Sequence, residues 1–180
     1  MTLEELIITL ARTAGSIPVL KWWFVGSIIA IIVDFSDLFM MNLLNLGGVR
    51  NYQSLDKLND LIYMATFLLV SLRWSGIARK VAISLFIYRI VGVVLFEVVE
   101  TRSILLFFPN VFEFWFLFIA GLRKFIPKYE LTWKRTMIWI IPLILLKEFQ
   151  EYVLHGGKWL DEYRAIDVVT NWWNLATSIL

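Results

Sequence analysis

The chain contains no cysteine, and its 180 residues include a single histidine, His155. The absence of cysteine excludes disulfide bonds, thiolate metal sites and cysteine nucleophiles. Zinc prefers sets of cysteine and histidine ligands, so the composition also argues against a zinc site. The sequence has no G-x-x-x-x-G-K-[ST], G-x-G-x-x-G, H-E-x-x-H or G-x-S-x-G motif. It therefore gives no sign of the common nucleotide-binding, zinc-peptidase or serine-hydrolase sites.

Charged residues are also scarce, at 18% of the chain, and the formal net charge is only +2. Such a small charge does not indicate binding to nucleic acid. Hydrophobic residues make up 59% of the chain and the mean hydropathy is +0.72, which is too apolar for an ordinary soluble domain. The composition predicts an all-α, polytopic integral membrane protein in which a helical bundle crosses the lipid bilayer.

Residues 1–20 are expected to form an amphipathic helix at the membrane interface. Thr2 and Glu5 match the capping-box pattern that starts a helix, and Leu3, Ile7 and Leu10 recur at helical spacing. Acidic residues stand where a cleavable signal peptide needs basic ones. This segment is therefore interpreted as an interfacial helix and not as a signal.

Residues 21–157 are expected to form the transmembrane bundle, because about 20 apolar residues are needed to cross the hydrocarbon core. The segment from 158 to 180 is expected to be a short span or an interfacial helix, which gives five or six spans in total. The expected spans are Trp22–Leu46, Leu55–Trp74, Val81–Val99, Ser103–Leu122 and Trp133–Lys147.

Basic residues gather in alternate loops, which predicts the orientation of the chain. By the positive-inside rule, the end with more Lys and Arg is cytoplasmic. The N-terminus is expected at this end, and the connection from Gly47 to Asp60 at the other. The basic loop residues are Arg73, Arg79, Lys80, Arg123, Lys124, Lys128, Lys134 and Arg135.

Several polar and charged residues lie inside the expected spans, where an isolated charge costs roughly 2.5–3.5 kcal/mol on insertion scales. These side chains are expected to face one another and to form one polar site. Asp34 or Asp37 is the expected partner of the only deeply placed cation, Arg89. The predicted intramembrane site comprises Asp34, Asp37, Arg89, Asn110 and Glu113.

The second expected span carries polar and acidic residues near its start, and Glu97 lies near the outer end of the third. Together these should form the outer mouth of the site, which comprises Asp56, Asn59, Asp60 and Glu97. Carboxylate oxygens suit Mg²⁺, Ca²⁺ or Mn²⁺. A divalent cation is therefore a possible cofactor, with Asp34, Asp37, Asp56 and Asp60 as its expected ligands.

The two aspartate pairs resemble part of the motif of CDP-alcohol phosphotransferases, D-x-x-D-G-x-x-A-R followed by G-x-x-x-D-x-x-x-D. The resemblance covers about 27 residues and implies divalent metals held by the four aspartates of a membrane enzyme. The chain departs from the motif at the two glycines, the alanine and the arginine. Those positions hold Leu38, Tyr52, Met41 and Asn42, and the interval between the pairs is one residue too long.

Three functions remain open at this stage. The first is a transport or channel-like module that handles a cation or a proton, and the second is a degenerate metal-dependent phosphotransferase. The third is an accessory subunit of a membrane complex, whose partner-facing or lipid-facing surface would include the aromatic-rich segment Phe107–Phe118. The lipid bilayer is the expected surrounding in each case, and a homo-oligomer or a partner within the membrane is expected.

Overall fold

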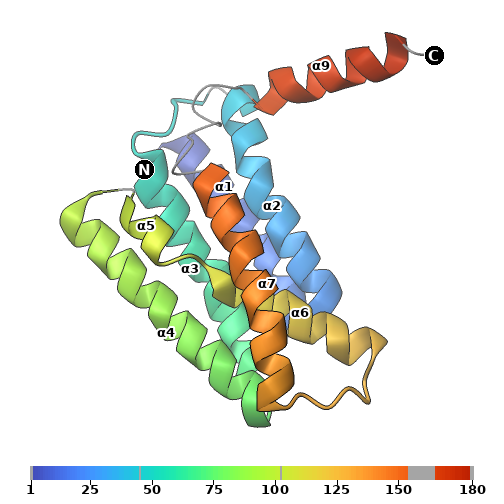
Figure 1. The fold of residues 1–180 in the computed structure, drawn as a ribbon. Helices are drawn as coiled ribbons and strands as arrows, with labels where there is room; N and C mark the ends of the chain where they lie inside the picture. The colour runs from blue at the N-terminus through green and yellow to red at the C-terminus, as the bar shows by residue number, and fades with distance from the viewer. Residues whose placement is uncertain (1, 45, 102, 154–164, 179–180) are drawn as a thin grey trace.

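The computed structural model describes residues 2–44, 46–101, 103–153 and 165–178. Every regular element in these ranges is helical, as the composition predicts. Figure 1 shows the elements in chain order. They are α1 (Leu3–Ser16), the 3₁₀ helix η1 (Ile17–Leu20), α2 (Trp23–Leu44), α3 (Tyr52–Ser71), α4 (Gly76–Val99), α5 (Ser103–Phe107), α6 (Val111–Phe125), α7 (Trp133–Glu151) and α9 (Ala165–Ser178).

Helix α1 begins with the capping box that the sequence predicts. The Thr2 hydroxyl accepts from the Glu5 N–H, and the Glu5 carboxylate accepts from the Thr2 N–H. The helix packs against α2 and α3. Glu4, Glu5 and Arg12 are buried, whereas Leu3, Leu6 and Leu10 are exposed. The polar face of α1 therefore points into the bundle and its apolar face points outward.

The long helices alternate in direction, so the connections lie at two ends of the bundle (Figure 1). Thr2 donates from its hydroxyl to the Gly48 carbonyl at 2.8 Å, which places the start of α1 beside the α2–α3 connection. Arg73, at the other end, donates to the Leu20 carbonyl at 3.2 Å. The sequence grouped the N-terminus with the basic loops, but the structure places Thr2 at the opposite end of the bundle from Arg73.

Helices α2 and α4 contain stretches, Trp23–Met41 and Gly76–Val99, that are long and apolar enough to cross a membrane by length and composition. Within the described residues, no other helix passes that test. The expected span 103–122 is divided in the structure into α5 and α6. Pro109 lies in the break between them, since it has no N–H to continue a helix.

Aromatic side chains fill the core of the bundle between this break and the end where the basic loops lie. Phe67 stacks on Phe116 with ring centroids 4.2 Å apart, and Trp74 stacks on the same ring at 5.2 Å. Phe112, Trp115 and Phe116 are fully buried. The expectation of an outward-facing aromatic segment is therefore wrong for these residues of α6, while Phe107 before the break is exposed.

Helix α9 contacts α2 and extends away from the rest of the bundle (Figure 1). It has 14 residues, or about 21 Å at 1.5 Å per residue. His155 and the remainder of the segment before α9 lie outside the described residues.

Candidate functional site

Arg12 is the centre of a buried cluster of ion pairs. Its guanidinium donates to Asp37 at 3.0 Å, to Asp56 at 3.0 Å and to Asp60 at 2.7 Å, and it also contacts Asp34. Arg12 and Asp37 are almost fully buried. A buried guanidinium surrounded by carboxylates gains charge-assisted hydrogen bonds that offset the cost of its removal from water.

The helices bring these side chains together through simple spacing. Asp34 and Asp37 are three residues apart on α2, and Asp56 and Asp60 are four residues apart on α3, so each pair shares one helix face. Gly15 permits α1 to approach α2, since a Cβ at this position would lie 2.9 Å from the Val33 side chain. Arg12, one turn before Gly15, therefore reaches the acidic faces of both neighbours.

Three of the four carboxylates approach each other closely. Asp34, Asp56 and Asp60 each offer one oxygen, and these oxygens lie within 4.8 Å of one another. Such a cluster resembles the oxygen ligands of a hard cation. Three of the four predicted metal ligands thus converge, but the cation among them in this structure is the guanidinium of Arg12, and Lys57 adds a second contact to Asp56 at 2.7 Å.

Arg89 lies on the other side of Asp60. It donates to the Phe108 carbonyl at 2.7 Å, and its guanidinium nitrogens lie 3.8 Å from Asp60 and 4.0 Å from Glu151. The prediction that Arg89 pairs with Asp34 or Asp37 is wrong, because Arg12 occupies that position. Arg89 instead links the Arg12 cluster to the break between α5 and α6.

The break supplies backbone groups and side chains to the same network. Asn110 donates from its N–H to Glu151 at 3.3 Å and from its amide to the Tyr63 hydroxyl at 2.9 Å. Tyr63 donates to Glu113 at 3.2 Å. Lys147 lies 3.1 Å from Glu113 and 3.7 Å from Glu151. Polar contacts of this kind satisfy the backbone of a broken helix inside a bundle.

The described residues therefore form one continuous polar network from α1 to α7. Six carboxyl groups belong to it, but only four basic side chains pair with them, so the carboxyl groups outnumber the cations. The carboxyl groups are those of Asp34, Asp37, Asp56, Asp60, Glu113 and Glu151, and the basic residues are Arg12, Lys57, Arg89 and Lys147.

Access to this network differs among its members. The side chains of Asp34 and Asp56 are 26% and 21% exposed, whereas those of Asp37 and Asp60 are 3% and 10% exposed. Asn59, beside Asp60 in the chain, is buried, and neither its amide nitrogen nor its oxygen has a hydrogen-bond partner among the described residues. A buried amide of this kind calls for a water or ligand partner.

Glu97 does not join the predicted mouth. It is exposed on α4, and within the described ranges no hydrogen bond or ion pair connects it with Asp56, Asn59 or Asp60. At 1.5 Å per residue, Glu97 lies about 12 Å along α4 from Arg89, beyond the reach of a direct ion pair.

Five further residues belong to the site but were not predicted from the sequence: Arg12, Lys57, Tyr63, Lys147 and Glu151. The usable signal for Arg12 was the spacing of Glu5, Arg12 and Ser16, which repeat at seven and four residues on one face of α1. The expectation of an interfacial helix assigned that polar face to water. In the structure the same face meets the aspartates of α2 and α3.

Glu4 and Glu5 attach the start of α1 to the α2–α3 connection, outside the span of the long helices. Glu4 accepts from the N–H groups of Leu46 and Gly48 at 3.0 and 3.1 Å. Glu5 accepts from the Arg50 N–H at 3.0 Å. The hydrogen bonds from the backbone of Arg50 and then of Thr2 lower the pKa of the Glu5 carboxyl.

Comparisons with known proteins find no family model, no curated protein and no solved structure that matches this chain. The function is therefore inferred from the geometry of the charge network.

Proposed function

We propose that this protein is a multi-pass membrane protein whose buried charge network binds and passes on a proton or a small cation. Its distribution of residues supports membrane insertion: charged side chains such as Arg12, Arg89 and Lys147 are buried, while Ile32, Val98 and Leu145 are exposed. Buried charges of this kind, together with a largely apolar exposed surface, are unusual in a water-soluble bundle. Lipid would surround the apolar faces, and the basic end would be cytoplasmic by the positive-inside rule.

The observation that carries the functional proposal is the cage of aspartate oxygens around Arg12. Three of these oxygens lie within 4.8 Å of one another, and at such distances two ionised carboxylates repel strongly in a low-dielectric core. The cage therefore favours a cation between its oxygens or a proton on one of them. Arg12 supplies a built-in cation that a proton or an incoming ion would replace in part.

The proposed route begins at the more exposed carboxylates, Asp34 and Asp56, and continues to Asp60. Beyond Asp60 the route continues through the carboxylates of Glu151 and Glu113. Arg89 keeps its proton and holds Asp60 and Glu151 in place at 3.8 and 4.0 Å, and Lys147 lies within 4.0 Å of Glu151 and Glu113. Uptake of a proton by Asp34 or Asp60 weakens the hold on the Arg12 guanidinium. Arg12 would then shift toward the remaining carboxylates, which couples occupancy of the site to the position of α1.

A flux measurement tests this proposal. The purified full-length protein is placed in liposomes that contain a pH-sensitive dye, and proton or cation gradients are imposed. Wild-type protein should conduct, and Asp34→Asn should lose the flux. Glu97→Gln is the matched control, because it removes an exposed carboxylate outside the network. Wild-type vesicles indistinguishable from empty vesicles under every gradient would contradict the proposal.

A structural role in a larger membrane complex is the second candidate. It is favoured by the pairing itself, since one guanidinium binds four carboxylates from two helices, and such contacts fix the register of neighbouring helices. Under this alternative Asp34→Asn lowers the thermal stability while wild-type protein shows no flux. A stabilisation by Mg²⁺ or Mn²⁺ that is lost in Asp56→Ala would instead favour the phosphotransferase-like alternative.

A further inference from the structure

An apolar groove runs along the outer face of α6, between α2 and α7, and has no part in the charge network. Its volume is about 510 Å³, within the range of roughly 300–1,000 Å³ that is usual for small-molecule sites. We refer to it as the α6 groove. Its lining includes Phe24, Phe114, Phe118, Gly121, Phe125 and Leu146.

The α6 groove has a cation at its end nearest the basic loops. The Lys124 ammonium lies 5.3 Å from the centroid of Phe24 and 5.4 Å from that of Phe125, two rings that line the groove. Lys124 is exposed, and none of the described residues forms a hydrogen bond or ion pair with its ammonium. The N–H donors of Lys124 are therefore available to an anion at this end of the α6 groove.

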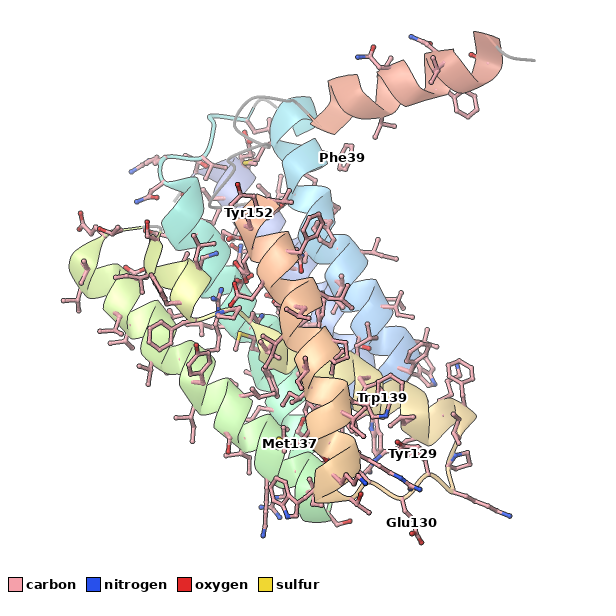
Figure 2. All side chains as sticks on the ribbon, in the orientation of Figure 1. Phe39, Tyr129, Glu130, Met137, Trp139 and Tyr152 are labelled. Carbon is pink, nitrogen blue, oxygen red and sulfur yellow. The ribbon has the colours of Figure 1, made fainter. Side chains whose placement is uncertain are left out.

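A pair of aromatic residues indicates how deep in a bilayer the Lys124 end of the α6 groove would lie. Trp139 packs against Phe118 with ring centroids 5.2 Å apart and donates to the Tyr129 hydroxyl at 2.9 Å. Figure 2 shows Tyr129 and Trp139 side by side near the start of α7, at the end of the bundle where the basic loops lie. Trp and Tyr prefer the headgroup level of a bilayer, so Lys124 stands where lipid phosphates are found.

We propose that the α6 groove binds one acyl chain of an anionic phospholipid whose phosphate is held by Lys124. The acyl chain packs against the apolar lining, and the exposed ammonium of Lys124 donates to the phosphate of the headgroup. Basic pockets between helices on the cytoplasmic side bind lipid headgroups in the same way. The groove extends from Lys124 to Phe114, ten residues or about 15 Å along α6. Phe114 in turn contacts Lys147, whose ammonium lies 5.2 Å from the ring centroid.

This proposal rests on the membrane placement given above, but it does not depend on proton or cation flux. The bound chain would end against Phe114, the residue that separates the α6 groove from the charge network. Asp34→Asn, which should lose flux, is therefore expected to keep the lipid preference. A loss of one property without the other would separate the two proposals.

The test compares phosphatidylglycerol with phosphatidylcholine on the purified full-length protein in detergent, by thermal unfolding and by native mass spectrometry. Phosphatidylglycerol should stabilise the wild type more and remain bound. Lys124→Glu should reduce the apparent affinity for phosphatidylglycerol about fivefold or more, since one basic residue near the surface contributes about that factor. Lys80→Glu, with the same charge change on α4, should leave the preference intact.

A second pair of variants tests the groove itself. Leu146 is exposed and lines the groove, whereas its exposed neighbour Leu145 does not. Leu146→Trp should fill the groove and reduce binding of both lipids, and Leu145→Trp should not. Equal affinity for the two lipids in wild-type protein, or an unchanged preference in Lys124→Glu, would overturn the proposal. So would equal stabilisation by glycerol phosphate alone, which would indicate a free-phosphate site.

Discussion

At the scale of single residues, Arg12 pairs with more carboxylates than any other basic side chain in the described part of the chain. Its guanidinium contacts four carboxylates from two helices. The removal of one partner from a buried ion pair leaves an uncompensated charge. Asp34, Asp37, Asp56 and Asp60 would then repel one another with only Lys57 and Arg89 nearby.

We therefore expect Arg12→Gln to lower the free energy of unfolding by about 3–5 kcal/mol. The double variant Arg12→Gln/Asp34→Asn should lose less than the sum of the two single variants, because Asp34→Asn removes part of the repulsion. Thermal unfolding in detergent measures both effects, with Arg50→Gln as the exposed control. Additive losses would show that Arg12 and Asp34 do not interact.

Glu5 gives a pH dependence whose sign follows from its lowered pKa. The folded state binds the Glu5 proton less readily than the unfolded state, so its stabilising contribution is present above the usual pKa of 4.5. That contribution disappears as the pH falls through the folded value. Glu5→Gln should therefore reduce the difference in thermal stability between pH 7 and pH 4.

The measurement compares the Tm of the wild type with that of Glu5→Gln at several pH values. The two curves should approach each other in acid, where the wild-type carboxylate has taken up its proton. A constant difference between the curves would show that the charge of Glu5 does not stabilise the turn at Arg50.

At the scale of elements, the break between α5 and α6 is held by the close approach of α4. A Cβ on Gly92 would lie 2.2 Å from the Phe108 Cβ, a distance that side chains do not adopt. Phe108 also offers the carbonyl that Arg89 binds. A shift of Phe108 would therefore disturb both the packing and the charge network.

Gly92→Ala should destabilise the protein by roughly 1–3 kcal/mol, the usual cost of excess volume in a packed core. Gly121→Ala is the matched control, because its Cβ would lie 3.2 Å from the edge of the Phe24 ring and a small rotation of that ring relieves the contact. Thermal unfolding should separate the two variants. Equal stability of Gly92→Ala and the wild type would mean that the contact between α4 and Phe108 is loose.

The sequence predicts where the helices lie better than it predicts which helices contact one another. Apolar runs indicate α2 and α4, but the single span expected over 103–122 missed the break at Pro109. The partner of Arg89 could not be predicted, since spacing defines the face of a helix but not which helix packs against it. Arg12 was missed for a related reason: in an apolar solvent the polar face of an amphipathic helix turns inward, so the same pattern predicts two opposite placements.

At the scale of the whole molecule, the absence of cysteine makes the arrangement of the two ends directly testable. Single cysteines can be introduced at Leu3, Arg50 and Lys80, which are all exposed. Leu3→Cys and Arg50→Cys should react with a membrane-impermeant maleimide from one side of the bilayer, and Lys80→Cys from the other. Labelling of Leu3→Cys from the same side as Lys80→Cys would place the N-terminus with the basic loops instead.

The inward polar face of α1 has a consequence for how the protein is made. In the membrane placement proposed above, a segment that carries Arg12 on one face cannot enter lipid by itself at low cost. It can do so once α2 and α3 present their aspartates to Arg12. Although α1 precedes α2 and α3 in the chain, we expect it to reach its final position after these two helices, so that the order of assembly differs from the order of synthesis.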